Sequence, residues 1–240
     1  MRPLLDGWSW PATCEICAGW PSRPVCAACL HDHGRVLPRC PGCALPLAPG
    51  LSHCTRCQGR HGHPLRRSHA RVDYTYPWTG LVQRFKFHGE PAWARTLAEL
   101  MLQDPEASDT LAQADWVAPI PLPLPRLLER GYNQAWELVR QLRRRVPEAP
   151  PAVADLLQRA DATTPIHTLP RAERLVHARH AFAVAPAHRP RLAGRHVLLV
   201  DDVMTTGATL TAAAQALRDA GAAAVSAWVF ARTPAPGSVE

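Results

Sequence analysis

Two adjacent carboxylates follow a short apolar run and precede a turn rich in small and hydroxyl residues. Residues 197–200 are all aliphatic, and a run of this length is typical of a strand buried on both faces. Asp201 and Asp202 come next, and an amphipathic helical pattern covers 208–220. The turn that leads into this pattern contains Thr205, Thr206, Gly207, Ala208 and Thr209.

This order of strand, turn and helix predicts an anion site. The first amides of a helix have no partners within it and lie at the positive end of its dipole, so a phosphate binds well there. Carboxylates repel a phosphate unless they hydrogen-bond neutral hydroxyls or face a metal ion. A sugar phosphate with its diol toward Asp201 and Asp202 meets both conditions. The alternative is an ordinary buried strand and helix joined by a polar turn.

Four C-x-x-C pairs contain all eight cysteines of the chain. Two such pairs complete one tetrahedral, all-thiolate zinc site, and the short gaps between pairs favour neighbours in the sequence. We therefore predict one zinc ion at Cys14, Cys17, Cys26 and Cys29, and a second at Cys40, Cys43, Cys54 and Cys57. The alternative pairing is interleaved, first pair with third and second with fourth. A disulfide scaffold is not favoured, because the N-terminus lacks the pattern of an export signal.

Basic residues between these motifs are candidates for a second anion contact. A strand pattern at 115–120 runs into Pro121, which must end the strand and begin a loop. Arg126 and Arg130 lie four residues apart on the helical turn that follows, and two guanidinium groups suit a diphosphate. The alternative is a pair of solvated arginines that contact glutamates. Lys86, the only lysine, either faces an anion or is a solvated flank between two phenylalanines.

Composition and element order predict a globular α/β protein. The chain has 240 residues, 47% of them hydrophobic, and no run approaches the ~20 apolar residues of a membrane span, so a cytoplasmic protein is expected. Short apolar runs alternate with helical patterns, which predicts a mostly parallel sheet with its ligand site at the carboxyl ends of the strands. Five further strands are predicted, at 72–76, 115–120, 153–157, 182–184 and 224–230.

A polar, basic connection at 61–71 predicts a domain boundary near residue 64. The chain would then consist of a small metal-binding domain over 1–63 and an α/β domain over 64–240. The net charge of +7 and the pI near 9.3 suit an anionic partner, either a nucleic acid or a phosphorylated small molecule.

The stretch VLLVDDVMTTGATL resembles the phosphoribosyl-diphosphate (PRPP) signature of type I phosphoribosyltransferases. Together with the four C-x-x-C pairs, RFKFHG, and PIPLP followed by RGYNQA, it makes the chain similar to the ComF family (ComFC/GntX-like). Proteins of that family are associated with DNA uptake and natural transformation in bacteria. The resemblance implies a type I phosphoribosyltransferase fold preceded by a double zinc ribbon. It also implies transfer of a phosphoribosyl (pentosyl) group from magnesium-bound PRPP, or a related ribose phosphate, to an unknown acceptor.

By position, the resemblance implies that Asp201 and Asp202 hold the ribose hydroxyls and that residues 205–209 hold the 5′-phosphate. The loop that begins at Pro121 would meet the diphosphate. Magnesium would bind mainly through the ligand and water. The alternative function is a non-catalytic accessory that binds single-stranded DNA and contacts other DNA-uptake proteins.

The chain departs from the family pattern between the second anion loop and the signature. Ile166 and His177 stand where relatives often carry Gln and Asn, so no base contact is transferred to that region. Arg174 keeps the basic character of the pattern and remains a candidate site residue.

Overall fold

The computed structural model describes residues 12–59, 63–159 and 181–235. The chain divides into two compact units, Met1–Val36 and Leu37–Glu240. The segment with the last four cysteines therefore belongs to the same compact unit as the α/β region. The domain boundary expected near residue 64 stays a prediction.

The first unit is a small ribbon that ends in a short helix. An antiparallel bridge joins Ala12 to Ser22. The helix α1 (Ala27–His33) is capped at its start by Cys26, whose side chain accepts a hydrogen bond from the backbone N–H of Cys29. A cysteine thus takes the place of the usual hydroxyl or carboxylate cap, and the start of the helix is tied to the cysteine cluster.

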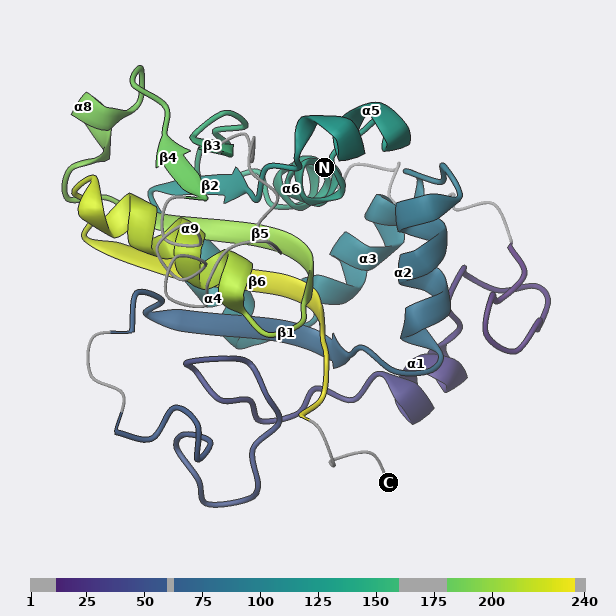
Figure 1. The fold of residues 1–240 in the computed structure, drawn as a ribbon. Helices are drawn as coiled ribbons and strands as arrows, with labels where there is room; N and C mark the ends of the chain where they lie inside the picture. Colours follow the sequence, from purple (N-terminus) through teal and green to yellow (C-terminus); the bar gives the residue numbers. More distant parts are fainter. Residues whose placement is uncertain (1–11, 60–62, 160–180, 236–240) are drawn as a thin grey trace, which may run out of the picture. The chain divides into compact units, whose positions relative to one another are not determined.

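The second unit is built on a four-stranded parallel sheet, which confirms the predicted α/β class (Figure 1). Its strands lie in the order β1-β6-β5-β2, with β5 and β6 in the centre. An antiparallel pair, β3 and β4, forms a separate small sheet. The bounds are β1 (Arg67–Asp73), β2 (Trp116–Pro119), β3 (Leu157–Arg159), β4 (Phe182–Val184), β5 (His196–Met204) and β6 (Ala224–Arg232).

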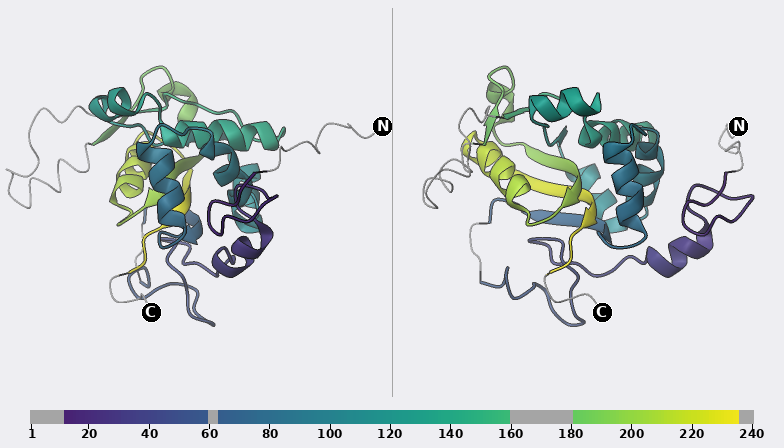
Figure 2. Two further views of the ribbon diagram at one scale, coloured as in Figure 1. Left: turned by 90° about the vertical axis from the view of Figure 1, so that its right-hand side faces the viewer. Right: turned by 45° about the vertical axis from the view of Figure 1, so that its right-hand side comes forward.

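Helices cover the sheet, with α9 drawn on the side away from the blue and teal helices α2, α3 and α6 (Figure 2). The helix α9 (Ala208–Asp219) buries Leu210, Ala213, Ala214 and Leu217, as its amphipathic pattern predicts. On the other face Trp78 packs edge-on against Phe230, with ring centroids 5.8 Å apart. The remaining helices of this unit are α2 (Trp78–Phe87), α3 (Trp93–Met101), α4 (Pro105–Gln113), α5 (Leu124–Arg130), α6 (Gln134–Arg145) and α8 (Arg189–Leu192).

The strand β1 differs from the sequence prediction, because it begins at Arg67 within the stretch expected to be a polar connection. Its polar residues are buried and have partners. His69 Nε2 lies 2.8 Å from Thr110 Oγ1, and Arg71 Nε donates to the carbonyl of Leu100 at 2.9 Å. These partners satisfy most of the buried polar atoms, with Arg71 Nη1 left without one among the described residues, so a basic sequence is accommodated in an edge strand.

Two other predicted segments need correction or lie outside the description. The strand expected over 153–157 is wrong: Ala152 makes only an isolated bridge to Val117, and β3 begins at Leu157. The helical segment expected at 171–179 lies outside the described residues.

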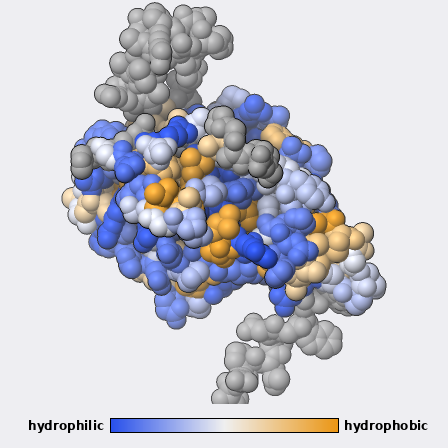
Figure 3. Space-filling model, turned by 90° about the horizontal axis from the view of Figure 1, so that it is seen from below, coloured by the Kyte–Doolittle hydropathy of each residue, from blue (hydrophilic) through white to orange (hydrophobic). Residues whose placement is uncertain are grey.

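Among the described residues, no helix is long and apolar enough to cross a membrane. The face drawn in Figure 3 is mostly hydrophilic where it is coloured, and its hydrophobic residues form separate patches.

Candidate functional site

The two acids stand at the carboxyl end of the central strand β5. Residues 196–200 of that strand are buried, and Asp202 remains buried at its end. Side chains alternate between the faces of a strand, so Asp201 and Asp202 point in opposite directions. Asp202 points to the face that carries α2, where its Oδ1 lies 2.8 Å from Lys86 Nζ. Only 7% of the Asp202 side chain and 19% of the Lys86 side chain are exposed.

The other acid, Asp201, lies in a different electrostatic environment. Burial, and then the charge of Asp202, raises the pKa of Asp201 to about 7. The positive charges of Lys86 and Arg159 oppose this shift, as does a hydrogen bond of 2.9 Å from the backbone N–H of Asp202. Asp201 is therefore only partly ionised near neutral pH, and a ligand that requires the carboxylate form binds more tightly as the pH rises through about 7.

The turn after β5 is open to solvent and shaped for an anion. Thr205, Thr206, Ala208 and Thr209 are exposed, and Gly207 has a φ of 84°, a conformation that favours glycine. The backbone N–H of Ala208 contacts Thr206 Oγ1 at 3.3 Å. Within the described part of the chain, the N–H groups of Thr206 and Gly207 have no hydrogen-bond acceptor. The turn therefore offers amides to a ligand at the start of α9.

The predicted second anion loop begins beside these acids. The register pairs Pro119 of β2 with Val200 of β5, and the N–H of Ile120 donates to the carbonyl of Val200 at 3.0 Å. Pro121 therefore follows at the same edge of the sheet as Asp201. Asn133 connects the far end of this loop, because its Nδ2 donates to the carbonyl of Ile120 at 3.0 Å while its Oδ1 caps α6.

The two arginines of this loop are both engaged with protein groups. Arg126 pairs with Glu129 at 3.0 Å on the exposed surface, which is the alternative that the sequence left open for it. The Arg130 guanidinium lies 4.8 Å from the centre of the Phe87 ring and donates to Gln134 Oε1 at 3.0 Å. Anion binding by either residue stays a prediction. Arg174, Ile166 and His177 lie outside the described residues.

Sequence reasoning missed two residues at this site. The Tyr132 hydroxyl donates to the carbonyl of Phe85, next to Lys86, and burial raises the pKa of that hydroxyl. Arg159 lies over the Phe182 ring, with its guanidinium carbon 5.4 Å from the ring centre, and its charge acts on Asp201. Tyr132 could have been found within RGYNQ, but Arg159 belongs to no motif.

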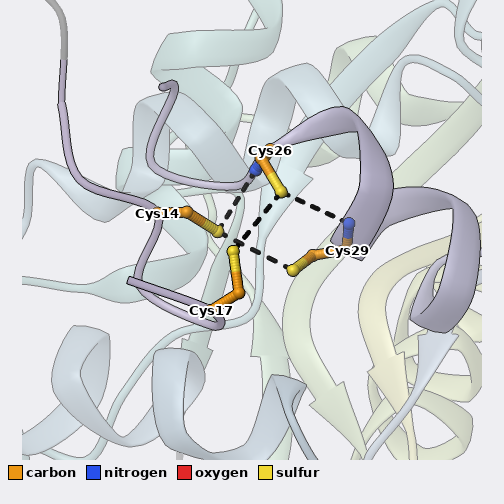
Figure 4. Close-up of side chains that lie close together, drawn as sticks. All are labelled: Cys14, Cys17, Cys26 and Cys29. Atoms are coloured by element: carbon orange, nitrogen blue, oxygen red, sulfur yellow. Dashed lines mark hydrogen bonds between the residues drawn. The ribbon is translucent and has the colours of Figure 1, made fainter. Parts of the chain in front are cut away.

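Two groups of four cysteines have the geometry of metal sites, and each group joins neighbouring C-x-x-C pairs, as the consecutive arrangement predicts. The first group contains Cys14, Cys17, Cys26 and Cys29, whose side chains converge in Figure 4. In each group the four Sγ atoms all lie within 4.8 Å of one another. The second group contains Cys40, Cys43, Cys54 and Cys57.

The sulfur separations fit zinc. Tetrahedral zinc with Zn–S bonds of about 2.3 Å requires sulfur atoms about 3.8 Å apart. The Cys14–Cys29, Cys17–Cys26 and Cys43–Cys54 pairs have separations of 3.9, 3.7 and 3.5 Å. Both groups also share one backbone contact, in which the N–H of the third cysteine lies 3.4 Å from the first sulfur. Such contacts stabilise thiolates, the form that binds metal.

A glycine at the second cluster is constrained by the sulfurs themselves. A Cβ added at Gly42 would lie 3.0 Å from Cys57 Sγ and 3.3 Å from Cys57 Cβ. At Gly19, beside the first cluster, the nearest atom would be Cys17 Sγ at 3.4 Å. The second cluster is therefore packed more tightly against its glycine than the first.

Comparison with known proteins places this geometry in a family. The chain is 32% identical over 212 residues to DNA utilization protein YhgH of Salmonella typhimurium, covering 87% of this chain and 90% of that protein. The chain belongs to the ComF family. A second ComF relative, competence protein F of Haemophilus influenzae, is 30% identical over 220 residues with the same coverage.

A more distant ComF relative is competence protein ComFC of Bacillus subtilis, which is 26% identical over 223 residues. It covers 89% of this chain, and this chain covers 86% of it. A family model described as a phosphoribosyl transferase domain matches residues 135–239, the part of this ComF chain that contains β5, the turn and α9.

Gly42→Ala is expected to empty the second cluster and leave the first intact. The added methyl group would lie 3.0 Å from Cys57 Sγ, so this ligand must shift by a few tenths of an ångström, and the metal content should fall from about two ions per chain toward one. Elemental analysis of purified protein measures this. Gly19→Ala is the matched control and should keep about two ions. Full metal content in Gly42→Ala would contradict the packing argument.

Lys86→Met is expected to destabilise the chain by about 2–3 kcal/mol, because it leaves Asp202 buried without its cation. The loss is smaller than for a fully buried pair, since part of Lys86 is in contact with water. Urea unfolding measures the change. The double variant Lys86→Met/Asp202→Asn removes the unpaired charge and should recover most of the loss. Equal stability of Lys86→Met and wild type would mean that the pair contributes nothing.

Proposed function

We propose that the chain binds magnesium-bound PRPP at the carboxyl edge of its sheet and serves DNA uptake as a phosphoribosyltransferase-like protein. The observation that carries the proposal is the position of Asp201 and Asp202 at the end of β5, directly before an exposed turn with free amides. The match to a phosphoribosyl transferase domain supports the ligand class. The relatives named for competence and DNA utilization support the process.

Each part of a ribose phosphate has a counterpart in the proposed site. The acids accept hydrogen bonds from the ribose hydroxyls, and the amides of residues 205–209 hold the 5′-phosphate. The loop that begins at Pro121 lies where the diphosphate would extend. Magnesium, when bound with PRPP, supplies positive charge to the diphosphate and is held largely by ligand and water oxygens.

The proposed chemistry is displacement at the anomeric carbon of the sugar. The protein then contributes placement and charge stabilisation rather than a nucleophile. Asp201 and Asp202 stabilise positive charge that develops on the ribose, and Lys86 pairs with the buried Asp202 at 2.8 Å.

The proposal includes two structural zinc ions, one in each cysteine cluster. The sulfur separations support zinc, and four thiolates suit a closed site with no open position for catalysis. Few aliphatic residues surround the first cluster, so the metal would supply much of the folding free energy of that ribbon.

Isothermal titration with magnesium and PRPP tests the function. We expect binding that depends on magnesium and that strengthens about tenfold from pH 6 to pH 8, because Asp201 with a pKa of about 7 must lose its proton. Asp201→Asn should bind more weakly at pH 8 and show a smaller pH dependence, since its amide does not titrate. Asp202→Asn should weaken binding about 10- to 100-fold through the loss of charge-assisted hydrogen bonds.

The same titration can refute the proposal. Tight PRPP binding that is unaffected in the Asp201→Ala/Asp202→Ala double variant would place the ligand elsewhere. No binding by the wild-type protein at millimolar PRPP would remove the function itself.

A second candidate function is binding of single-stranded DNA without catalysis. It is favoured by the net charge of +7 and by Phe87, which is 57% exposed and stacks on Arg130 near the site. Aromatic rings beside arginines are typical of single-strand binding surfaces.

For this second function, Phe87→Ala should weaken binding of an oligo(dT) strand about tenfold in a gel shift, and binding should fall steeply with salt. Leu51→Ala is the control, because Leu51 is similarly exposed at 53% but is not aromatic. The absence of any shift at low salt would exclude this surface.

A further inference from the structure

One buried arginine connects the second cysteine cluster to the turn after β5. Arg232 is the last residue of β6 and is only 2% exposed. Its Nε donates to the carbonyl of Cys43 at 2.7 Å, and its Nη1 donates to the carbonyl of Met204 at 3.1 Å. Nη1 also donates to the carbonyl of Thr205, the first residue of the turn. A single rigid guanidinium group thus holds the backbone of a cysteine ligand and the backbone of the turn.

The position of Arg232 in the sheet makes this connection stiff. The register pairs Arg232 with Met204 across β6 and β5 and with Asp73 across β6 and β1. The N–H of Thr233 donates to the carbonyl of Met204 at 3.0 Å, which extends the ladder by one further bond. The guanidinium therefore starts from a fixed backbone, and its planar fork fixes the carbonyls that it binds.

A cavity lies between the second cysteine cluster and the turn after β5. The cavity of about 420 Å³ has the cysteine ribbon on one side and the start of α9 on the other. Cys43 and Cys57 line it from the ribbon, Thr206 and Gly207 line it from the turn, and Arg232 lines it as well. Because the space between ribbon and turn is partly empty, close packing does not hold the turn there, and the hydrogen bonds of Arg232 carry more of the connection.

The charge of the metal-bound cluster also acts on Arg232. Four thiolates around one divalent ion carry a net charge of −2, and an arginine that is hydrogen-bonded to a ligand residue offsets part of it. Loss of the metal would change the conformation of the Cys43 backbone and the charge beside Arg232 together. Both changes act on the donor that holds the carbonyls of Met204 and Thr205.

We propose that Arg232 is a positioning residue that couples metal binding at the second cysteine cluster to the order of residues 203–209. Metal at the first cluster has no such effect. The coupling rests on the proposed function only where affinity for a ribose phosphate is concerned, because order in the turn is a property of the protein alone. Linkage requires the reverse effect too, so a ligand in the turn raises the affinity of the second cluster for its metal.

The two clusters provide matched variants for the test. Cys54→Ser removes the third cysteine of the second cluster, and Cys26→Ser removes the equivalent residue of the first. Each full-length variant should lose about one metal ion by elemental analysis. Amide hydrogen exchange in peptides that span 203–211 should be about tenfold faster in Cys54→Ser and unchanged in Cys26→Ser. Equal exchange in the two variants would overturn the proposal.

Arg232→Lys separates the arginine from the metal. It keeps the charge but loses the fork, so metal content should stay near two ions while exchange in 203–211 rises as in Cys54→Ser. A merely structural role would instead accelerate exchange throughout the sheet. If Arg232→Lys does not fold, wild-type protein still decides the matter. At equilibrium with a competing chelator, one of its two ions should be held about tenfold more tightly in saturating ribose 5-phosphate. Where titration shows that ribose 5-phosphate binds, metal affinity that it does not alter would overturn the proposal.

Failure of the coupling and failure of the proposed function give different results. If wild-type protein does not bind ribose 5-phosphate in a titration, the proposed function fails, but the exchange comparison between the cysteine variants still tests Arg232. If ribose 5-phosphate binds and both cysteine variants bind it as wild type does, the function stands and the coupling is wrong.

Discussion

The second unit is organised around the burial of two carboxylates at the end of an otherwise apolar strand. A central strand of a parallel sheet is shielded on both faces, so its last residues leave the apolar core without full access to water. An ionised Asp202 in that position is stable only with a cation, and Lys86 supplies one at 2.8 Å. Asp201 is opposed by the charge of its neighbour, which together with burial raises its pKa. The site is thus short of positive charge and of hydroxyl donors before any ligand binds.

The contacts of α2, α6 and the loop after β2 can be understood from this need for a cation beside Asp202. The helix α2 must hold Lys86 against the end of β5, and the bond from Tyr132 to the carbonyl of Phe85 fixes that helix to the start of α6. Asn133 fixes the loop after β2 to the same place. Tyr132 and Asn133 of the motif RGYNQ therefore hold α2 and the loop after β2 in place, and the same motif leads into α6. That role depends on contacts between segments that are far apart in the sequence.

The parts of the site that could be predicted are those whose signal is local. Four aliphatic residues, two acids, a glycine-containing turn and an amphipathic helix predict β5 and α9, because each step follows from its neighbours in the chain. The cysteine clusters could be predicted for the same reason, since C-x-x-C spacing nearly determines the geometry of two ligands. The strand β1 could not be, because its polar residues are stable in the sheet only through Thr110, Leu100 and Gln103. Whether Lys86 faces an anion or solvent was likewise undecidable, since its partner is Asp202.

The two cysteine clusters show which structural features the C-x-x-C spacing predicts and which it does not. Both have the same knuckle, with a left-handed residue after the second cysteine, Ala18 at a φ of 58° and Ala44 at 57°. Spacing predicts this shared geometry, but it does not predict which ribbon becomes part of the sheet unit. Residues outside the knuckles decide that: Ser68 N–H donates to the carbonyl of Pro41 at 2.7 Å, and Arg39 pairs with Asp73 at 2.8 Å.

These anchors are arginines and backbone groups rather than a large apolar surface. Ala44 does join the apolar core, but the other connections of the second ribbon, including the bond from Arg232 to the carbonyl of Cys43, are directional. Apolar packing tolerates small shifts, whereas a buried guanidinium whose carbonyl moves away is left with an unsatisfied donor, at a cost of about 1–3 kcal/mol or more. A ribbon attached in this way transmits changes in its own geometry to the sheet edge. The same attachment by aliphatic side chains would absorb them.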